Sequence, residues 1–223
     1  MIWVGMIAGF GLDFPRFLSR KPPAPVIVHL HALAFVGWLV YLTIQVALVL
    51  RLDIAAHRRL GMFGAVLAAV MVPLGLAAVL TTDARAQLLG QGRPQFLAVN
   101  FVDLFSFAVL VAAGIAMRNH AASHKRLMLL GTIALTDAGF SRIFSVPDPT
   151  TILPWFALYF YGPVLLIGSM AAWDLWRYRR VHPTIMLGGG LVLSGEFGAT
   201  LLFFNPSWKA ISTRIVEAWT YTG

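Results

Sequence analysis

Long apolar runs without charged residues are the feature that most constrains this chain. Residues 24–50 read APVIVHLHALAFVGWLVYLTIQVALVL, which is 27 residues without Asp, Glu, Lys or Arg. About 20 apolar residues in a helix cross the roughly 30 Å hydrocarbon core of a bilayer. Only 12% of all residues are charged, whereas a soluble domain has about 25%. The chain has too few charges to cover a soluble surface, so we expect an integral membrane protein in contact with the lipid bilayer.

Six apolar segments predict an all-α, polytopic transmembrane helix bundle over residues 24–204. The N-terminal segment, residues 1–23, begins with MIWVGMIAGFGL, which is too short to span. It is either an interfacial piece or the remnant of a longer helix, so six spans are expected and seven remain open. The tail, residues 205–223, has the apolar spacing of a short amphipathic helix on the outer surface. The predicted spans are 24–50, 60–80, 95–117, 127–146, 152–173 and 183–204.

Basic residues predict the orientation of the bundle. Three short loops, at 51–59, 118–126 and 177–182, hold nine of the 17 Lys and Arg residues and fall on one side. The positive-inside rule places these loops in the cytoplasm. The same rule explains the net charge of +8, so we expect no nucleic-acid partner. The chain has no cysteine, which excludes disulfides, thiolate metal sites and cysteine nucleophiles.

One short motif occurs twice. AHRRLGMFG begins at Ala56 and SHKRLMLLG begins at Ser123, and a weaker third copy, VHPTIMLGG, begins at Val181. Each copy opens the second helix of a predicted hairpin, and each has a Gly seven residues after its His. Residues seven apart share one helix face, where a small residue lets a neighbouring helix approach closely. The motif therefore predicts three tandem helical hairpins.

The three motif histidines, His57, His124 and His182, are predicted to lie at the same depth on three different helices. Two histidines from two helices of a bundle can ligate a heme, so these residues are candidate ligands for heme b or another metal cofactor. The alternative is that they are partly hydrated residues at the membrane interface, near anionic lipid headgroups. The flanking Arg and Lys residues disfavour a bound cation and support that alternative.

Polar side chains within the predicted spans form a second candidate site. Charged groups inside a membrane are costly and usually functional. We count depth from the cytoplasmic ends of the predicted spans at 1.5 Å per residue. Asp137 is then about 16 Å deep, and Asp103 and Glu196 are roughly 21 Å along their helices. Arg142 points away from the face of Asp137, so we expect it to pair with Asp103 or Glu196. The alternative is a buried structural network. The candidate residues are His31, Gln45, Asn100, Asp103, Asp137, Arg142 and Glu196.

Within this second set, His31 is chosen over its neighbour His29. Residues two apart on a helix point about 200° apart, so the two imidazoles of HLH cannot both face one site. His31 shares a stripe with Trp38 and Gln45, which are spaced by sevens. We therefore expect His31 to face the bundle, with Gln45 deeper along the same face.

Aromatic residues gather at both ends of the fifth predicted span, in PWFALYFYGP at 154–163 and WDLWRY at 173–178. Trp and Tyr are enriched at membrane interfaces, so these runs are typical of aromatic belts. The alternative is a contact surface for a quinone or a pigment.

The ordered motifs VHLHALAFVGWLVYL, HRRLG, FLAVNFVDL, HKRLMLLGTIAL and HPTIMLGGG cover most of residues 24–204. In this order they resemble a family of uncharacterised bacterial multi-pass membrane proteins. The resemblance implies a location in the bacterial inner membrane and lends no established activity. Members are expected to begin with a full extra helix, and this chain departs from that pattern.

Three functions remain open from the sequence. The first is a redox-linked protein that binds heme or metal, or a subunit of an electron-transfer assembly, with His57 and His124 as axial ligands and His182 as a substitute. The second is a small proton-coupled transporter or channel that uses the intramembrane acids. The third is a structural subunit that associates with other membrane proteins. No nucleophile elbow and no phosphate-binding loop occurs in the sequence.

Overall fold

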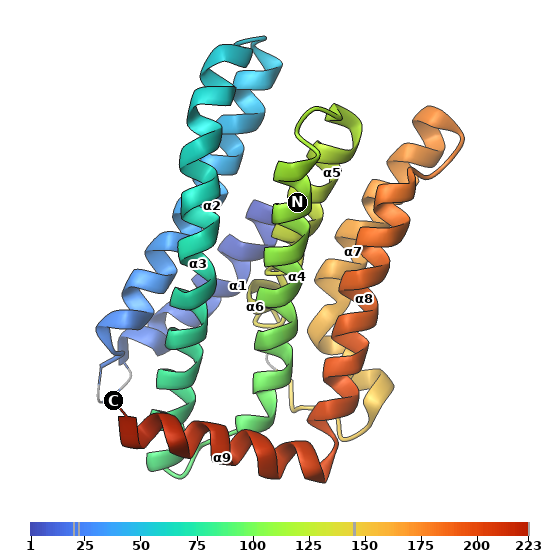
Figure 1. The fold of residues 1–223 in the computed structure, drawn as a ribbon. Helices are drawn as coiled ribbons and strands as arrows, with labels where there is room; N and C mark the ends of the chain where they lie inside the picture. Colours follow the sequence, from blue (N-terminus) through green and yellow to red (C-terminus); the bar gives the residue numbers. More distant parts are fainter. Residues whose placement is uncertain (20, 22, 145, 223) are drawn as a thin grey trace.

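The computed structural model describes residues 1–19, 21, 23–144 and 146–222. The fold is all-α, and the helices are joined by short loops (Figure 1). The helices are α1 (Ile2–Ser19), α2 (Val26–Leu50), α3 (Ile54–Leu88), the 3₁₀ turn η1 (Pro94–Phe96), α4 (Leu97–Ala116), α5 (Ala121–Ile133), α6 (Asp137–Phe140), α7 (Ile152–Tyr178), α8 (Pro183–Phe203) and α9 (Pro206–Thr222).

Five segments are long and apolar enough to cross a membrane, namely α2, α3, η1 with α4, α7 and α8. They stand side by side in Figure 1, and the α2–α3, α4–α5 and α7–α8 connections all lie at one end. We call this the basic end, because these connections and the adjoining helix turns carry the nine basic residues counted above. The chain is therefore a polytopic membrane protein, with five candidate spans in its described part.

The fourth predicted span, residues 127–146, is not one helix. α5 ends at Ile133, the chain turns at residues 134–136, and α6 begins at Asp137. In the turn each backbone hydrogen bond spans three residues instead of four. Leu135 N donates to Thr132 O, and Thr136 N donates to Ile133 O. The Thr136 hydroxyl also donates to Ile133 O. The break could not be predicted from the apolar run, because hydropathy does not distinguish a continuous helix from a broken one.

α1 packs against the broken segment through glycine. A Cβ at Gly9 would overlap the Gly139 carbonyl, and a Cβ at Gly5 would overlap the Phe140 ring. α1 therefore approaches α6 more closely than it could if Gly5 and Gly9 carried side chains. α1 runs obliquely to the long helices in Figure 1 and contacts α6.

This contact yields a stability prediction. We expect Gly9→Ala to lower the free energy of unfolding by about 1–3 kcal/mol, because the added methyl meets backbone that cannot rotate away. Gly11→Ala is the matched control on the same helix, since nothing lies within 4 Å of its Cβ position. Thermal unfolding in detergent measures both variants. Equal melting temperatures for the two would contradict the close α1–α6 contact.

α9 lies across the end of the bundle opposite the basic loops (Figure 1). The Trp208 indole donates to Gln95 O at 3.0 Å, and Ser212 and Val216 are fully buried. One face of the tail helix is thus packed on the bundle, and α9 covers the opposite end of α3, η1 and α8.

Candidate functional site

Three acidic side chains meet inside the bundle. Asp103 comes from α4, Asp137 from the start of α6 and Glu196 from α8. The side chains of Asp103 and Asp137 lie within hydrogen-bonding range of each other, and Glu196 interacts electrostatically with both. All three are buried, and Glu196 is only 1% exposed. The structure therefore joins the three acids that the sequence placed near one depth. We call Asp103, Asp137 and Glu196 the acid cluster.

The acid cluster has more acceptor atoms than partners. Asp103 Oδ1, Asp137 Oδ1 and both carboxyl oxygens of Glu196 are buried without a hydrogen-bond partner in the described part of the chain. Two carboxyl groups hydrogen bond to each other only when one of them carries a proton. Burying three unpaired negative charges would cost far more than the stability of a protein. The cluster therefore brings three ionisable groups together away from water.

Arg142 does not neutralise the acid cluster by a direct ion pair. Its Nε lies 3.6 Å from Asp13 Oδ2, its guanidinium stands 4.9 Å from the centroid of the Phe10 ring, and an Nη donates to Ala138 O. The prediction that Arg142 pairs with Asp103 or Glu196 is wrong. The reason is α1, whose position was not predicted and which brings Asp13 to Arg142. Arg142 keeps only an electrostatic interaction with Asp137.

The other predicted intramembrane residues lie apart from the acid cluster in their contacts. The His31 ring packs on Phe35 with centroids 4.0 Å apart, and His31 Nδ1 is buried without a partner in the described residues. The Asn100 amide donates to Phe96 O. Gln45 reaches towards the basic end and contacts the Tyr41 hydroxyl at 2.6 Å.

The structure also brings His57 and His124 together at the basic end. Their ring centroids are 6.2 Å apart, and the planes meet at 82°. His124 Nδ1 lies 2.8 Å from Gly114 O. A carbonyl only accepts, so Nδ1 carries the proton and Nε2 has a free lone pair in the neutral ring. The Gln45 amide, in the orientation that satisfies both of its ends, donates to His57 Nδ1 at 2.6 Å.

His182 has a different environment. Its Nδ1 accepts from Thr184 N at 3.2 Å, which makes this imidazole the N-cap of α8. Its backbone N–H donates to Asp174 Oδ2 at 3.1 Å. This ring is used to begin a helix, whereas His57 and His124 face each other.

A buried ion pair that the sequence did not reveal lies beside His182. Arg126 Nε donates to Asp174 Oδ2 at 3.1 Å, and an Nη donates to the other carboxylate oxygen. The Arg126 side chain is 8% exposed and that of Asp174 is 2% exposed. The pair joins α5 to α7, and Asp174 also holds the start of α8. The only sequence signal was the position of Arg126 within the repeated motif.

The 6.2 Å separation of the His57 and His124 rings would fit a ligand atom shared between them. His57 Nδ1 already accepts a hydrogen bond, so its Nε2 bears the proton in the neutral ring. Neither histidine lines either of the two grooves described for this chain. In the described residues, no group of three or more His, Cys, Asp or Glu side chains is arranged to hold a metal ion.

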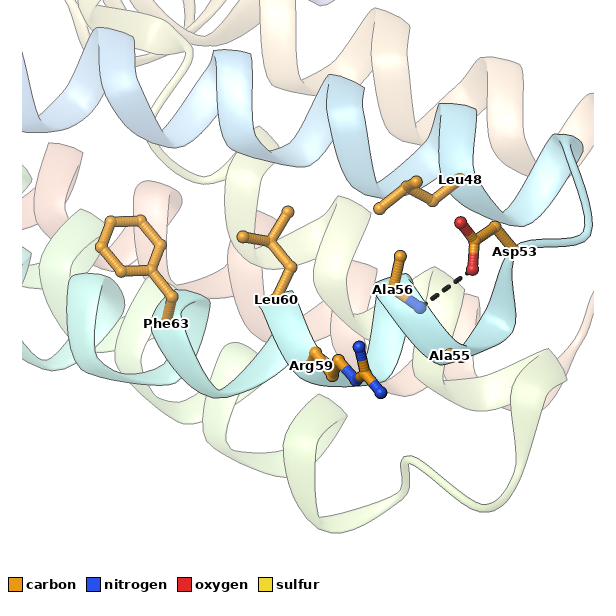
Figure 2. Close-up of a pocket in the computed structure, with 7 residues that line it drawn as sticks. All are labelled: Leu48, Asp53, Ala55, Ala56, Arg59, Leu60 and Phe63. Atoms are coloured by element: carbon orange, nitrogen blue, oxygen red, sulfur yellow. Dashed lines mark hydrogen bonds between the residues drawn. The ribbon is translucent and has the colours of Figure 1, made fainter.

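A groove lined by residues of the first copy of the motif runs between α2 and α3 near the basic end and has a volume of about 560 Å³. Figure 2 shows Leu48, Leu60 and Phe63 along it, and Asp53 hydrogen bonded to Ala56 N. The carboxylate of Asp53 is thus used to cap α3. The remaining lining is mostly apolar, which is what a lipid-facing groove requires.

Comparison with known proteins identifies no family for this chain. No protein-family description, no curated protein and no solved structure matches this chain. The candidate function therefore depends on the site itself.

Proposed function

We propose that this chain is a proton-coupled membrane transporter whose proton-binding element is the acid cluster. The observation that carries the proposal is that three buried carboxyl groups from three helices, those of Asp103, Asp137 and Glu196, lie close enough to interact electrostatically. Ionisable groups at membrane depth usually mark an ion or proton path. A static network of buried acids is usually built around a basic partner, and no salt bridge in the described part of the chain includes any of these three acids.

The helix break supports the same proposal. Asp137 is the first residue of α6, directly after the turn at residues 134–136. Transporters commonly form their sites at discontinuous helices, because a break lets one half of the helix move against the other. Movement of α6 would change the distance between Asp137 and the other two acids, which α4 and α8 hold in place. Since that distance sets how many protons the cluster holds, such movement would couple protonation to conformation.

Liposomes that contain the purified protein and a trapped pH indicator test the proposal. We expect that adding a deproteinised extract of small molecules outside the liposomes changes the internal pH in the presence of the protein. Liposomes with heat-inactivated protein are the control. If extracts from several growth conditions move no protons through the active protein, the proposal of proton-coupled transport is wrong.

A redox function is the second candidate, and one observation favours it, namely the 6.2 Å separation of the His57 and His124 rings. Bound heme would supply electron transfer at the basic end. His124 Nε2 would ligate it, and His57 Nε2 would join if Gln45 turned its amide oxygen towards His57 Nδ1. If this function holds, the protein purified in mild detergent shows a Soret band that shifts on reduction, and His57→Ala or His124→Ala removes it. His182→Ala would keep the band, because His182 lies outside the pair. A colourless, metal-free preparation would contradict the redox function.

A further inference from the structure

A second groove lies between α2 and α7 and has a volume of about 620 Å³. Volumes of about 300–1,000 Å³ are usual for sites that hold a small molecule. Besides α2 and α7, the groove is lined by one face of α5, from Lys125 to Ile133, and by Ile2 and Trp3 in the first turn of α1. In Figure 1 this turn of α1 lies part-way along the bundle. We call this cavity the α2–α7 groove.

The inner part of the α2–α7 groove suits hydrocarbon. Its lining includes Leu42, Leu129 and Met170. The two hydroxyl groups in the lining are already used. The Thr43 hydroxyl accepts from Trp3 Nε1 at 2.9 Å and donates to a backbone carbonyl of its own helix at 2.8 Å. The Ser169 hydroxyl likewise donates to a carbonyl one turn back on α7, at 2.7 Å. These polar groups therefore need no water, and an apolar chain can lie against them.

The mouth of the α2–α7 groove, at the basic end, has positive charge that no acid neutralises. Lys125 lines the groove, is exposed, and joins none of the ion pairs in the described part of the chain. The Arg177 guanidinium, also outside those ion pairs, lies 5.7 Å from the ring centroid of Tyr178, another lining residue. Arg126 and Asp174 line the same mouth, but they pair with each other. The positive charge of Lys125 and Arg177 therefore remains available to an anionic group.

The depth of the α2–α7 groove is close to that of one leaflet. Lys125 and Ile133 both line it, and they are eight residues apart on α5. At 1.5 Å per residue this separation is about 12 Å, whereas half of the hydrocarbon core of a bilayer is about 15 Å thick. The groove thus has the positive charge where a lipid headgroup lies and the apolar lining where an acyl chain lies.

We propose that the α2–α7 groove binds an anionic phospholipid of the surrounding bilayer, with one acyl chain along α5 and the phosphate at Lys125 and Arg177. Basic pockets between transmembrane helices at the cytoplasmic side bind the headgroups of anionic lipids. A zwitterionic phospholipid has the same acyl chains, but its own positive charge opposes Lys125 and Arg177, so the site prefers the anionic lipid. The groove shares no residue with the acid cluster, and the inference does not depend on proton transport.

Native mass spectrometry of the protein in detergent, titrated with phosphatidylglycerol or phosphatidylcholine, tests the headgroup site. We expect one phosphatidylglycerol to bind more tightly than phosphatidylcholine. Lys125→Gln should weaken phosphatidylglycerol binding about fivefold, which is the effect of one basic residue near a membrane surface. Arg118→Gln is the matched control, because Arg118 is an exposed basic residue at the same end that lines neither groove. It should bind the lipid as the wild type does.

A second pair of variants tests the acyl-chain site without a change of charge. Ser169→Phe places a ring inside the α2–α7 groove and should weaken phosphatidylglycerol binding at least about tenfold, because less of the acyl chain is then buried. Ser194→Phe is the matched control, since Ser194 is an exposed serine on α8 that lines neither groove. It should leave the binding unchanged.

Three results would overturn the inference. Equal weakening by Lys125→Gln and Arg118→Gln, or equal binding of the two lipids, would mean that lipid is attracted to the basic end in general and not to this mouth. Wild-type binding by Ser169→Phe would mean that no acyl chain lies in the groove. A dimer in the mass spectrum that Ser169→Phe dissociates would mean that a second copy of the chain, and not a lipid, occupies the groove.

Discussion

Asp174→Asn is expected to lower the free energy of unfolding by about 3–5 kcal/mol, because it leaves the buried Arg126 guanidinium without a counter-charge. The substitution keeps an acceptor for the His182 backbone N–H, so the start of α8 retains its hydrogen bond. The loss therefore reports the broken charge pair rather than the helix cap. Chemical denaturation in detergent, followed by far-UV circular dichroism, measures it.

Two further variants separate this effect from a general loss of packing. The double variant Arg126→Met with Asp174→Asn should recover most of the stability, since no buried charge is then left unpaired. Arg59→Met is the matched control, because Arg59 occupies the position of Arg126 in the first copy of the repeated motif and is exposed. We expect it to change stability by less than about 0.5 kcal/mol. A double variant as unstable as Asp174→Asn alone would contradict the explanation.

Glu196→Gln is expected to abolish proton-coupled flux in liposomes while the protein remains folded. Glutamine has the size of glutamate and can hydrogen bond, but it does not exchange a proton in this range of pH. Because Glu196 interacts with both aspartates, its loss removes one of the three exchangeable groups and changes the protonation of the other two. The initial rate of internal pH change should fall at least about tenfold, within the range for loss of a proton-transfer group.

Glu217→Gln is the matched control, since Glu217 is the other glutamate of the chain and lies exposed on α9. It should transport as the wild type does. The melting temperature of Glu196→Gln should stay at or above that of the wild type, because the variant buries no ionisable group at this position. Normal flux through Glu196→Gln would show that Glu196 has no part in transport.

The sequence predicted a helical membrane protein well, because length and hydropathy alone decide whether a segment can span. Depth along the helices predicted that Asp103, Asp137 and Glu196 lie at similar levels, and likewise His57 and His124. That they meet depends on which helices adjoin, which depth does not predict. Depth depends only on the rise per residue, which is the same in every α-helix.

Features that depend on contacts between distant segments could not be predicted in this way. Hydropathy carries no signal for the break at residues 134–136, and the approach of Gly9 to Gly139 exists only once α1 is placed. The partner of Arg142 was missed for the same reason, because Asp13 lies in the segment whose position was left open. Asp174 was not considered as the partner of Arg126, since the two are 48 positions apart and neither lies deep in a predicted span.

The central claim is that the acid cluster holds protons inside the membrane. Infrared difference spectroscopy of the purified protein near neutral pH tests it most directly, because a protonated carboxyl group has a carbonyl band that a carboxylate lacks. We expect this band in the wild type and in Glu217→Gln, and we expect it to be weaker in Glu196→Gln and weaker still when Asp103→Asn is added. A wild-type spectrum without the band would mean that the three acids are ionised together, and would contradict the proposed function.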